Sequence, residues 1–144
     1  MITDSVFETS KTITQYQIAE ADDIPIDKLY TCHMGTMQID VIDPVADYAD
    51  LMEHLFDFVK IETLFSSGLL TMCFDAMHAV TGPYAHEILE NRLGAPAGTV
   101  RNGTPSPDFG GGHPDPNPIW AKPLVDLVMG PDAPDFAAAS DGEK

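Results

Sequence analysis

The loop DFGGGHPDPNP at residues 108–118 combines residue types that could do chemistry. Its three successive glycines permit positive φ and the close approach of another backbone or a phosphate. No lysine follows them in the pattern of a nucleotide-binding phosphate loop. His113 and Asp115 could ligate a metal or act as acid and base. Alternatively, the prolines stiffen a turn whose polar side chains cap the next helix, and the residue types favour this second interpretation.

Two further polar side chains lie at or just after a predicted buried strand, residues 69–75. His78 could contact a ligand or hydrogen-bond the backbone of a tight turn, and the turn is favoured. Asp75 is interpreted as a turn or capping carboxylate rather than as a catalyst.

Asp141 follows a run of small residues at the end of the last predicted strand, 135–140. A carboxylate in a glycine-containing loop suits Mg²⁺, which binds through a few carboxylates plus substrate phosphate. Glu143 lies two residues further, and this spacing turns both side chains to one side of an extended loop. A polar chain end of this kind is also often frayed, so these residues alone leave the metal interpretation open.

Alternating strands and helices are predicted to position these residues. The predicted strands are 37–43, 69–75, 99–104 and 135–140, and the predicted helices are 44–59, 81–93 and 118–129. This order predicts an α/β layer fold with a largely parallel sheet. Ligands of such sheets bind beyond the carboxyl ends of the strands. A short helix in ITDSVFETSKTI and an acidic linker at 19–28 are predicted ahead of the sheet.

Composition excludes several classes of function. The 144 residues include 7 Lys+Arg and 23 Asp+Glu, a formal net charge of −16, with 44% apolar residues. The chain can therefore build a core, but nucleic acid and anionic membranes should be repelled. No apolar run approaches the ~20 residues of a membrane span, and the N-terminus lacks secretory features. Cys32 and Cys73 are expected to be reduced thiols rather than a disulfide.

Several motifs together resemble a known family. They are FDAMHAVTGPYAHEIL (74–89), LGAP (93–96), DFGGGHPDPN (108–117) and DFAAASDG (135–142), supported by ITDSVFETSKTI and VIDPVADYADLM. In this order they resemble the alpha-phosphoglucomutase branch of the alpha-D-phosphohexomutase superfamily. The resemblance covers nearly the whole chain, with Ala79 where the family usually has glycine.

The resemblance implies an isomerase of glucose metabolism. Such enzymes are cytoplasmic intramolecular phosphotransferases that interconvert glucose 1-phosphate and glucose 6-phosphate through a bisphosphate intermediate. A phosphoserine donates the phosphoryl group, and Mg²⁺ bridges it to three aspartates of a DGDGDR loop. Four α/β domains surround the cleft, and the second domain, a three-layer fold with a mixed, largely parallel sheet, supplies the metal loop.

The resemblance assigns residues 1–36 to the tail of the first domain and a linker, and 37–144 to a truncated second domain. Asp141 matches the first metal aspartate, and Glu143 stands where the second is expected. No catalytic residue is assigned, because this sequence lacks the phosphoserine loop. We expect this chain alone to be inactive, to hold Mg²⁺ weakly, and to self-associate through apolar surface. The alternative is a non-catalytic remnant or interaction domain.

Overall fold

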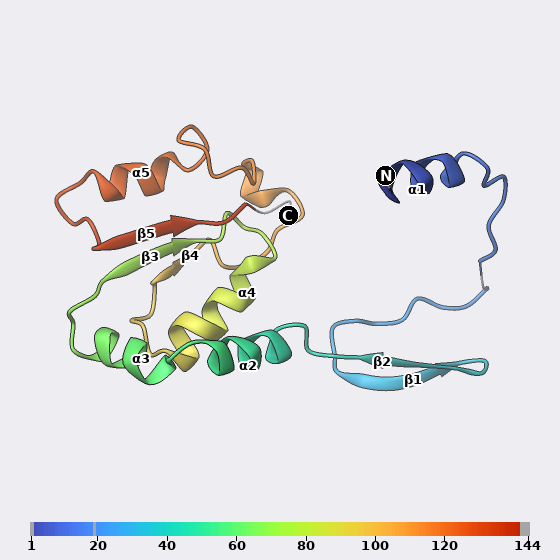
Figure 1. Ribbon diagram of the computed structural model, residues 1–144, viewed down its shortest axis with the longest axis horizontal. Helices are drawn as coiled ribbons and strands as arrows, with labels where there is room; N and C mark the ends of the chain where they lie inside the picture. Colours follow the sequence, from blue (N-terminus) through green and yellow to red (C-terminus); the bar gives the residue numbers. More distant parts are fainter. Residues whose placement is uncertain (1, 19, 142–144) are drawn as a thin grey trace. The chain divides into compact units, whose positions relative to one another are not determined.

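The computed structural model describes residues 2–18 and 20–141 (Figure 1). The chain divides into two compact units, Met1–Ile42 and Asp43–Lys144.

The first unit holds a helix and a hairpin. The helix α1 (Ile2–Ser10) agrees with the short helix predicted from the sequence, and none of its residues is buried. The strands β1 (Tyr30–Met34) and β2 (Met37–Val41) pair antiparallel, with Met34 opposite Met37. Gly35 supplies the positive φ of 62° for the two-residue turn between them.

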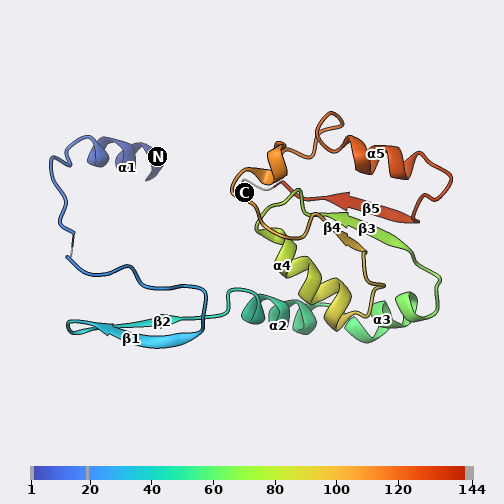
Figure 2. The same cartoon turned by 180° about the vertical axis from the view of Figure 1, so that it is seen from behind.

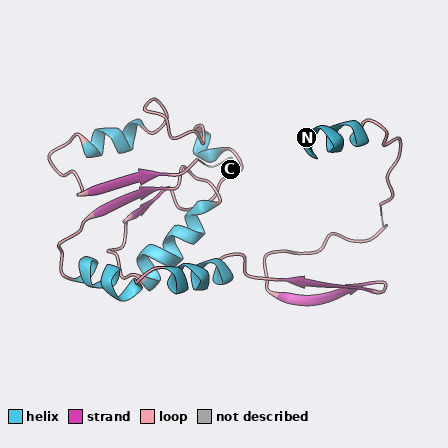
Figure 3. Cartoon of the chain, in the orientation of Figure 1, coloured by secondary structure: helices cyan, strands magenta, loops and turns pink. Residues whose placement is uncertain are grey.

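The second unit alternates helices and strands (Figure 3). In chain order its elements are α2 (Ala46–Leu55), α3 (Phe58–Ser66), β3 (Met72–Asp75), α4 (Thr81–Ala85), η1 (His86–Arg92), β4 (Val100–Arg101), η2 (Phe109–Gly111), α5 (Lys122–Val128) and β5 (Phe136–Ala139). The predicted helix 81–93 is therefore one α-helical turn that continues as a π-helix.

A parallel sheet forms the centre of this unit. Its strand order is β4-β3-β5, and β3 pairs in parallel with both neighbours. In both cartoon views α4 lies on one side of the sheet and α5 on the other (Figures 1 and 2). The predicted α/β layer fold is confirmed.

Two details of the predicted element order are wrong. The strand at Met37–Val41 does not join the parallel sheet, because its antiparallel partner lies only a tight turn away. The single helix predicted at 44–59 is two helices. The carboxylate of Asp57 accepts the Lys60 N–H at 3.1 Å and so caps a new helix, α3.

The main apolar cluster joins α3, η1 and the start of β3. Phe65, Leu93 and Ala95 are buried in it. Around them pack the partly buried side chains of Phe58, Ile61, Leu70, Met72, Ile88 and Leu89. Burial of these faces fixes the helices against one side of the sheet.

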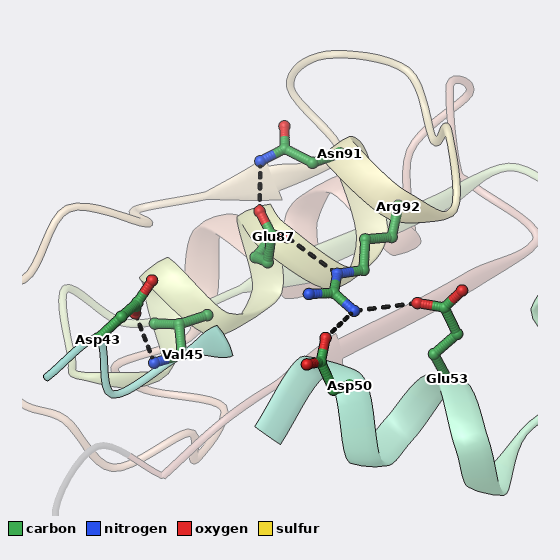
Figure 4. Close-up of polar contacts among 7 residues, drawn as sticks. All are labelled: Asp43, Val45, Asp50, Glu53, Glu87, Asn91 and Arg92. Atoms are coloured by element: carbon green, nitrogen blue, oxygen red, sulfur yellow. Dashed lines mark hydrogen bonds and ion pairs between the residues drawn. The ribbon is translucent and has the colours of Figure 1, made fainter. Parts of the chain in front are cut away.

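An ionic network centred on Arg92 links η1 to α2 (Figure 4). The Arg92 guanidinium contacts Asp50 at 2.7 Å, Glu53 at 3.0 Å and Glu87 at 2.9 Å. The Asn91 amide also donates to Glu87, at 2.8 Å. The bonds from Asn91 and Arg92 lower the pKa of the Glu87 carboxyl below its ordinary value of 4.5.

Just before α2, the Asp43 carboxylate accepts the Val45 N–H at 2.8 Å and closes a turn, and the N-cap residue of α2 is Val45 (Figure 4).

Replacing Arg92 by methionine should make the free energy of unfolding depend less on pH in the acid range. A carboxyl with a lowered folded-state pKa stabilises the fold above its ordinary pKa and loses that effect as pH falls. The Arg92→Met chain should therefore show a lower urea midpoint than wild type at pH 7. The difference should shrink as pH drops below 4.5, the ordinary pKa of Glu87. Lys122→Met, which removes an exposed pair with Asp126, is the control. If the difference in urea midpoint between wild type and Arg92→Met stays constant from pH 7 to acid pH, the stabilising role of the Arg92 network is contradicted.

Candidate functional site

A cavity of about 290 Å³ lies at the carboxyl ends of β3 and β4. In parallel α/β sheets this edge is where ligands bind. The lining residues come from the turns after both strands and from the loop that leads to α5: Asp75, Met77, His78, Asn102, Phe109, Gly110, Gly112, His113, Trp120 and Pro123. The structure thus brings His78 and His113 to one cavity.

Asp75 lines this cavity and is only 2% exposed. One carboxylate oxygen accepts the Met77 N–H at 2.9 Å and the Asn102 side-chain amide at 2.8 Å. These bonds satisfy a buried charged group and tie together the turns after β3 and β4. They agree with the interpretation of Asp75 as a turn carboxylate.

Backbone strain concentrates around the cavity. Within the described part of the chain, the non-glycine residues with positive φ are Met77 (53°), His78 (57°), Asn102 (50°) and Phe109 (52°), and all four line it. The His78 N–H donates to the Asn102 carbonyl at 3.0 Å, and this bond holds both of these positive-φ residues in place. Asn102 therefore forms a turn, a conformation that asparagine tolerates. Such strain persists only where the surroundings enforce it, and it often marks functional sites.

The glycine loop makes room for an imidazole. Gly110 has a φ of 68°, and a Cβ added there would lie 2.6 Å from Cδ2 of His78. A Cβ at Gly111, with a φ of 75°, would meet nothing within 4 Å. The Asp108 carboxylate accepts the Gly110 N–H at 3.1 Å and a bond from the Ser106 hydroxyl. These bonds, chiefly the one from Ser106, lower the pKa of Asp108.

The predicted alternatives for His113 and Asp115 separate in the structure. The His113 ring stacks on the Trp120 ring with 5.4 Å between centroids, and both line the cavity. Asp115 instead accepts bonds from the backbone and side-chain amides of Asn117. The Asn117 side chain in turn accepts the backbone N–H groups of Ile119 and Trp120. Asp115 thus belongs to the turn ahead of α5, whose N-cap residue is Ala121.

Asp141 lies beyond the end of β5, at the same edge of the sheet. The preceding residue, Ser140, donates its N–H to the Asp75 carbonyl at 3.1 Å. Its hydroxyl lies 2.6 Å from that of Thr81, so the first residue of α4 contacts the residue that follows β5. Glu143, the second predicted metal ligand, lies outside the described residues.

The Asp141 carboxylate is of the type that Mg²⁺ prefers. Among the described residues, however, no three His, Cys, Asp or Glu side chains gather around a point that could hold a metal ion. These residues alone therefore do not provide a complete magnesium site.

Both cysteines are free thiols, as predicted. Burial raises the pKa of the Cys73 thiol, so it stays protonated and belongs to the core.

Known proteins resemble the chain over nearly its whole length. A phosphoglucomutase from Rhizobium radiobacter is 58% identical over 142 residues and covers 99% of this chain. The corresponding identities are 47% for a chloroplastic phosphoglucomutase from Marchantia polymorpha and 42% for a probable cytoplasmic one from Arabidopsis thaliana. The crystal structure of parafusin, a phosphoglucomutase from Paramecium, matches 97% of the chain with a TM-score of 0.87 and 35% identity. The predicted resemblance is confirmed.

The match concerns only part of each relative. The chain spans 26% of the Rhizobium and Arabidopsis proteins, 22% of the Marchantia protein and 27% of the Paramecium chain. No protein-family model matches it.

Alanine at Gly110 should displace His78, whereas alanine at Gly111 should not. Both changes place a side chain at positive φ, which costs about 1–2 kcal/mol. Only Gly110→Ala adds a clash with the imidazole, worth a further ~1–3 kcal/mol. Urea unfolding should therefore show a larger loss of stability for Gly110→Ala, and the His78 ring resonances should shift only in that variant. Equal effects of the two variants would refute the close packing of His78 on Gly110.

Proposed function

We propose that this chain is a segment of a phosphoglucomutase, which interconverts glucose 1-phosphate and glucose 6-phosphate through an enzyme phosphoserine and a bisphosphate intermediate. One observation carries the proposal. Proteins named phosphoglucomutase match 99% of the chain at 39–58% identity. The likeness to the parafusin structure supports the same assignment.

Within such an enzyme, we propose that residues 1–36 correspond to the end of the first domain with a linker, and 37–144 to the second domain. The hairpin of β1 and β2 spans this boundary, and the compact units divide six residues later, after Ile42. Asp141 is proposed as one carboxylate of the magnesium site, because it follows a strand at the ligand-binding edge of the sheet. No reaction step is assigned to this chain, since the described residues form no complete metal site.

The proposed substrates are glucose phosphates, and the proposed location is the cytoplasm.

A net charge of −16 argues against contact with nucleic acid or anionic lipid. Over the described residues, no helix has the length and apolar character to cross a membrane. Exposed apolar side chains such as Leu51, Leu55 and Phe56 support self-association of the isolated chain.

The proposal is tested by expressing the complete reading frame that contains this chain and assaying its product. We expect mutase turnover in a coupled assay, with the phosphoryl group passing through a phosphoserine. Asp141→Ala in that protein should lower kcat/KM by about 100-fold or more, in the range of losses seen when charge-stabilising groups are removed. Asp132→Ala, at an exposed carboxylate, should leave it unchanged. A reading frame that adds no further domain, or a product without turnover, would favour the non-catalytic alternative.

The chain by itself should give no turnover, even with Mg²⁺ and the bisphosphate activator. Residues of one catalytic unit act jointly, and this sequence contains no phosphoserine loop. A coupled assay on the purified chain and on its Asp141→Ala variant measures this. Turnover that disappears in the variant would contradict the expectation. Turnover that survives in it would identify a contaminating host enzyme.

A further inference from the structure

Ser140, the residue between β5 and Asp141, is held at two points. Its N–H donates to the Asp75 carbonyl at 3.1 Å, and its hydroxyl lies 2.6 Å from the Thr81 hydroxyl. The first bond continues the pairing of β3 with β5, whereas the second comes from the start of α4, 59 residues away in the chain. A backbone bond and a side-chain bond together fix the direction in which the chain leaves β5 for Asp141.

The first turn of α4 is a firm support for the Thr81 hydroxyl. Gly82 packs so closely on the turn after β4 that an added Cβ would lie 1.9 Å from the Gly103 carbonyl oxygen. The Gly82 N–H also donates to the Ala79 carbonyl at 3.2 Å. The branched Cβ of Thr81 restricts its χ1 rotamers, so the hydroxyl points in few directions. Thr81 therefore ties the end of β5 to a helix start that is itself packed against the turn after β4.

A fixed backbone direction at Ser140 affects how well Asp141 can bind a cation. The apparent affinity of a site falls in proportion to the fraction of molecules that hold the binding-competent conformation. Mg²⁺ is sensitive to this fraction, because it demands near-ideal octahedral geometry. A hydroxyl pair that stabilises one conformation at Ser140 therefore strengthens binding at the next residue without contacting the cation.

We propose that Thr81 is a positioning residue for Asp141. Its hydroxyl holds Ser140, and Ser140 holds the adjoining carboxylate where that carboxylate can bind Mg²⁺. The inference rests on the proposed function, which assigns Asp141 to a magnesium site. Thr81 itself neither contacts the cation nor takes part in phosphoryl transfer.

The dissociation constant of Mg²⁺, measured by calorimetry without substrate on the product of the complete reading frame, tests the proposal. Thr81→Val removes the hydroxyl with little change in shape. It should raise the constant about 3- to 10-fold, the usual effect of one neutral hydrogen bond. Thr81→Ser keeps a hydroxyl and should restore most of the affinity. The matched control is Thr63→Val, at an exposed threonine of α3 whose hydroxyl donates to the Val59 carbonyl at 2.7 Å, and it should bind like wild type.

Ser140→Ala removes the same bond from its other side and should raise the constant by a similar factor. In the double variant Thr81→Val/Ser140→Ala the two effects should not multiply, because both changes break one interaction. In a turnover assay, each variant should raise the Mg²⁺ concentration that gives half the maximal rate. KM for glucose 1-phosphate at saturating Mg²⁺ should stay unchanged, whereas a general loss of packing would alter both quantities.

The proposal is overturned if Thr81→Val binds Mg²⁺ as wild type does, or if Thr81→Ser binds as weakly as Thr81→Val. It is also overturned if the two single effects multiply in the double variant, or if the wild-type protein binds no Mg²⁺.

Calorimetry separates this inference from the proposed function, because binding of Mg²⁺ requires no turnover. Binding that depends on Thr81 in a protein without mutase activity would remove only the proposed function. Mutase activity with Mg²⁺ binding that is unaffected by Thr81→Val would remove only the inference.

Discussion

The buried carboxylate of Asp75 is the point on which the functional edge of the α/β unit depends. It ends the central strand and accepts bonds from Met77 and Asn102, so a single side chain fixes the turns after β3 and β4. Its own carbonyl accepts the N–H of Ser140, just before Asp141. Removing a partner of a buried charged group leaves it unsatisfied, which is more costly than the bond itself is stabilising. The positions of His78 and Asn102 therefore depend on the Asp75 side chain, and the backbone of the same residue holds the chain just before Asp141.

The opposite side of the unit is held by weaker and more distributed forces. Phe65 and Leu93 form an apolar cluster between α3 and η1, and Arg92 links η1 to the carboxylates of α2. Those carboxylates are largely exposed, so solvent screens each pair and no single one dominates. Apolar burial sets the distance between the helices and the sheet, whereas the ionic network selects which face of α2 meets η1.

These separate interactions explain how the α/β unit holds a defined site edge. Parallel pairing of three strands aligns their carboxyl ends whatever lies beyond them. The described residues therefore place Asp75, His78, His113 and Asp141 at one edge without completing a metal site there.

The sequence by itself determined the α/β alternation, the free thiols and the resemblance to phosphoglucomutases. The periodicity of apolar residues, the cysteine content and rare motifs can all be read from the chain without its tertiary structure. Only the tertiary structure decided that Met37–Val41 pairs in a hairpin and that a helix restarts at Asp57, since each depends on competition between nearby and distant partners. Tertiary structure alone also joined His78, Asn102 and Trp120 in one cavity. Their types are visible in the sequence, but their meeting depends on the register of parallel strands and on positive φ at residues other than glycine.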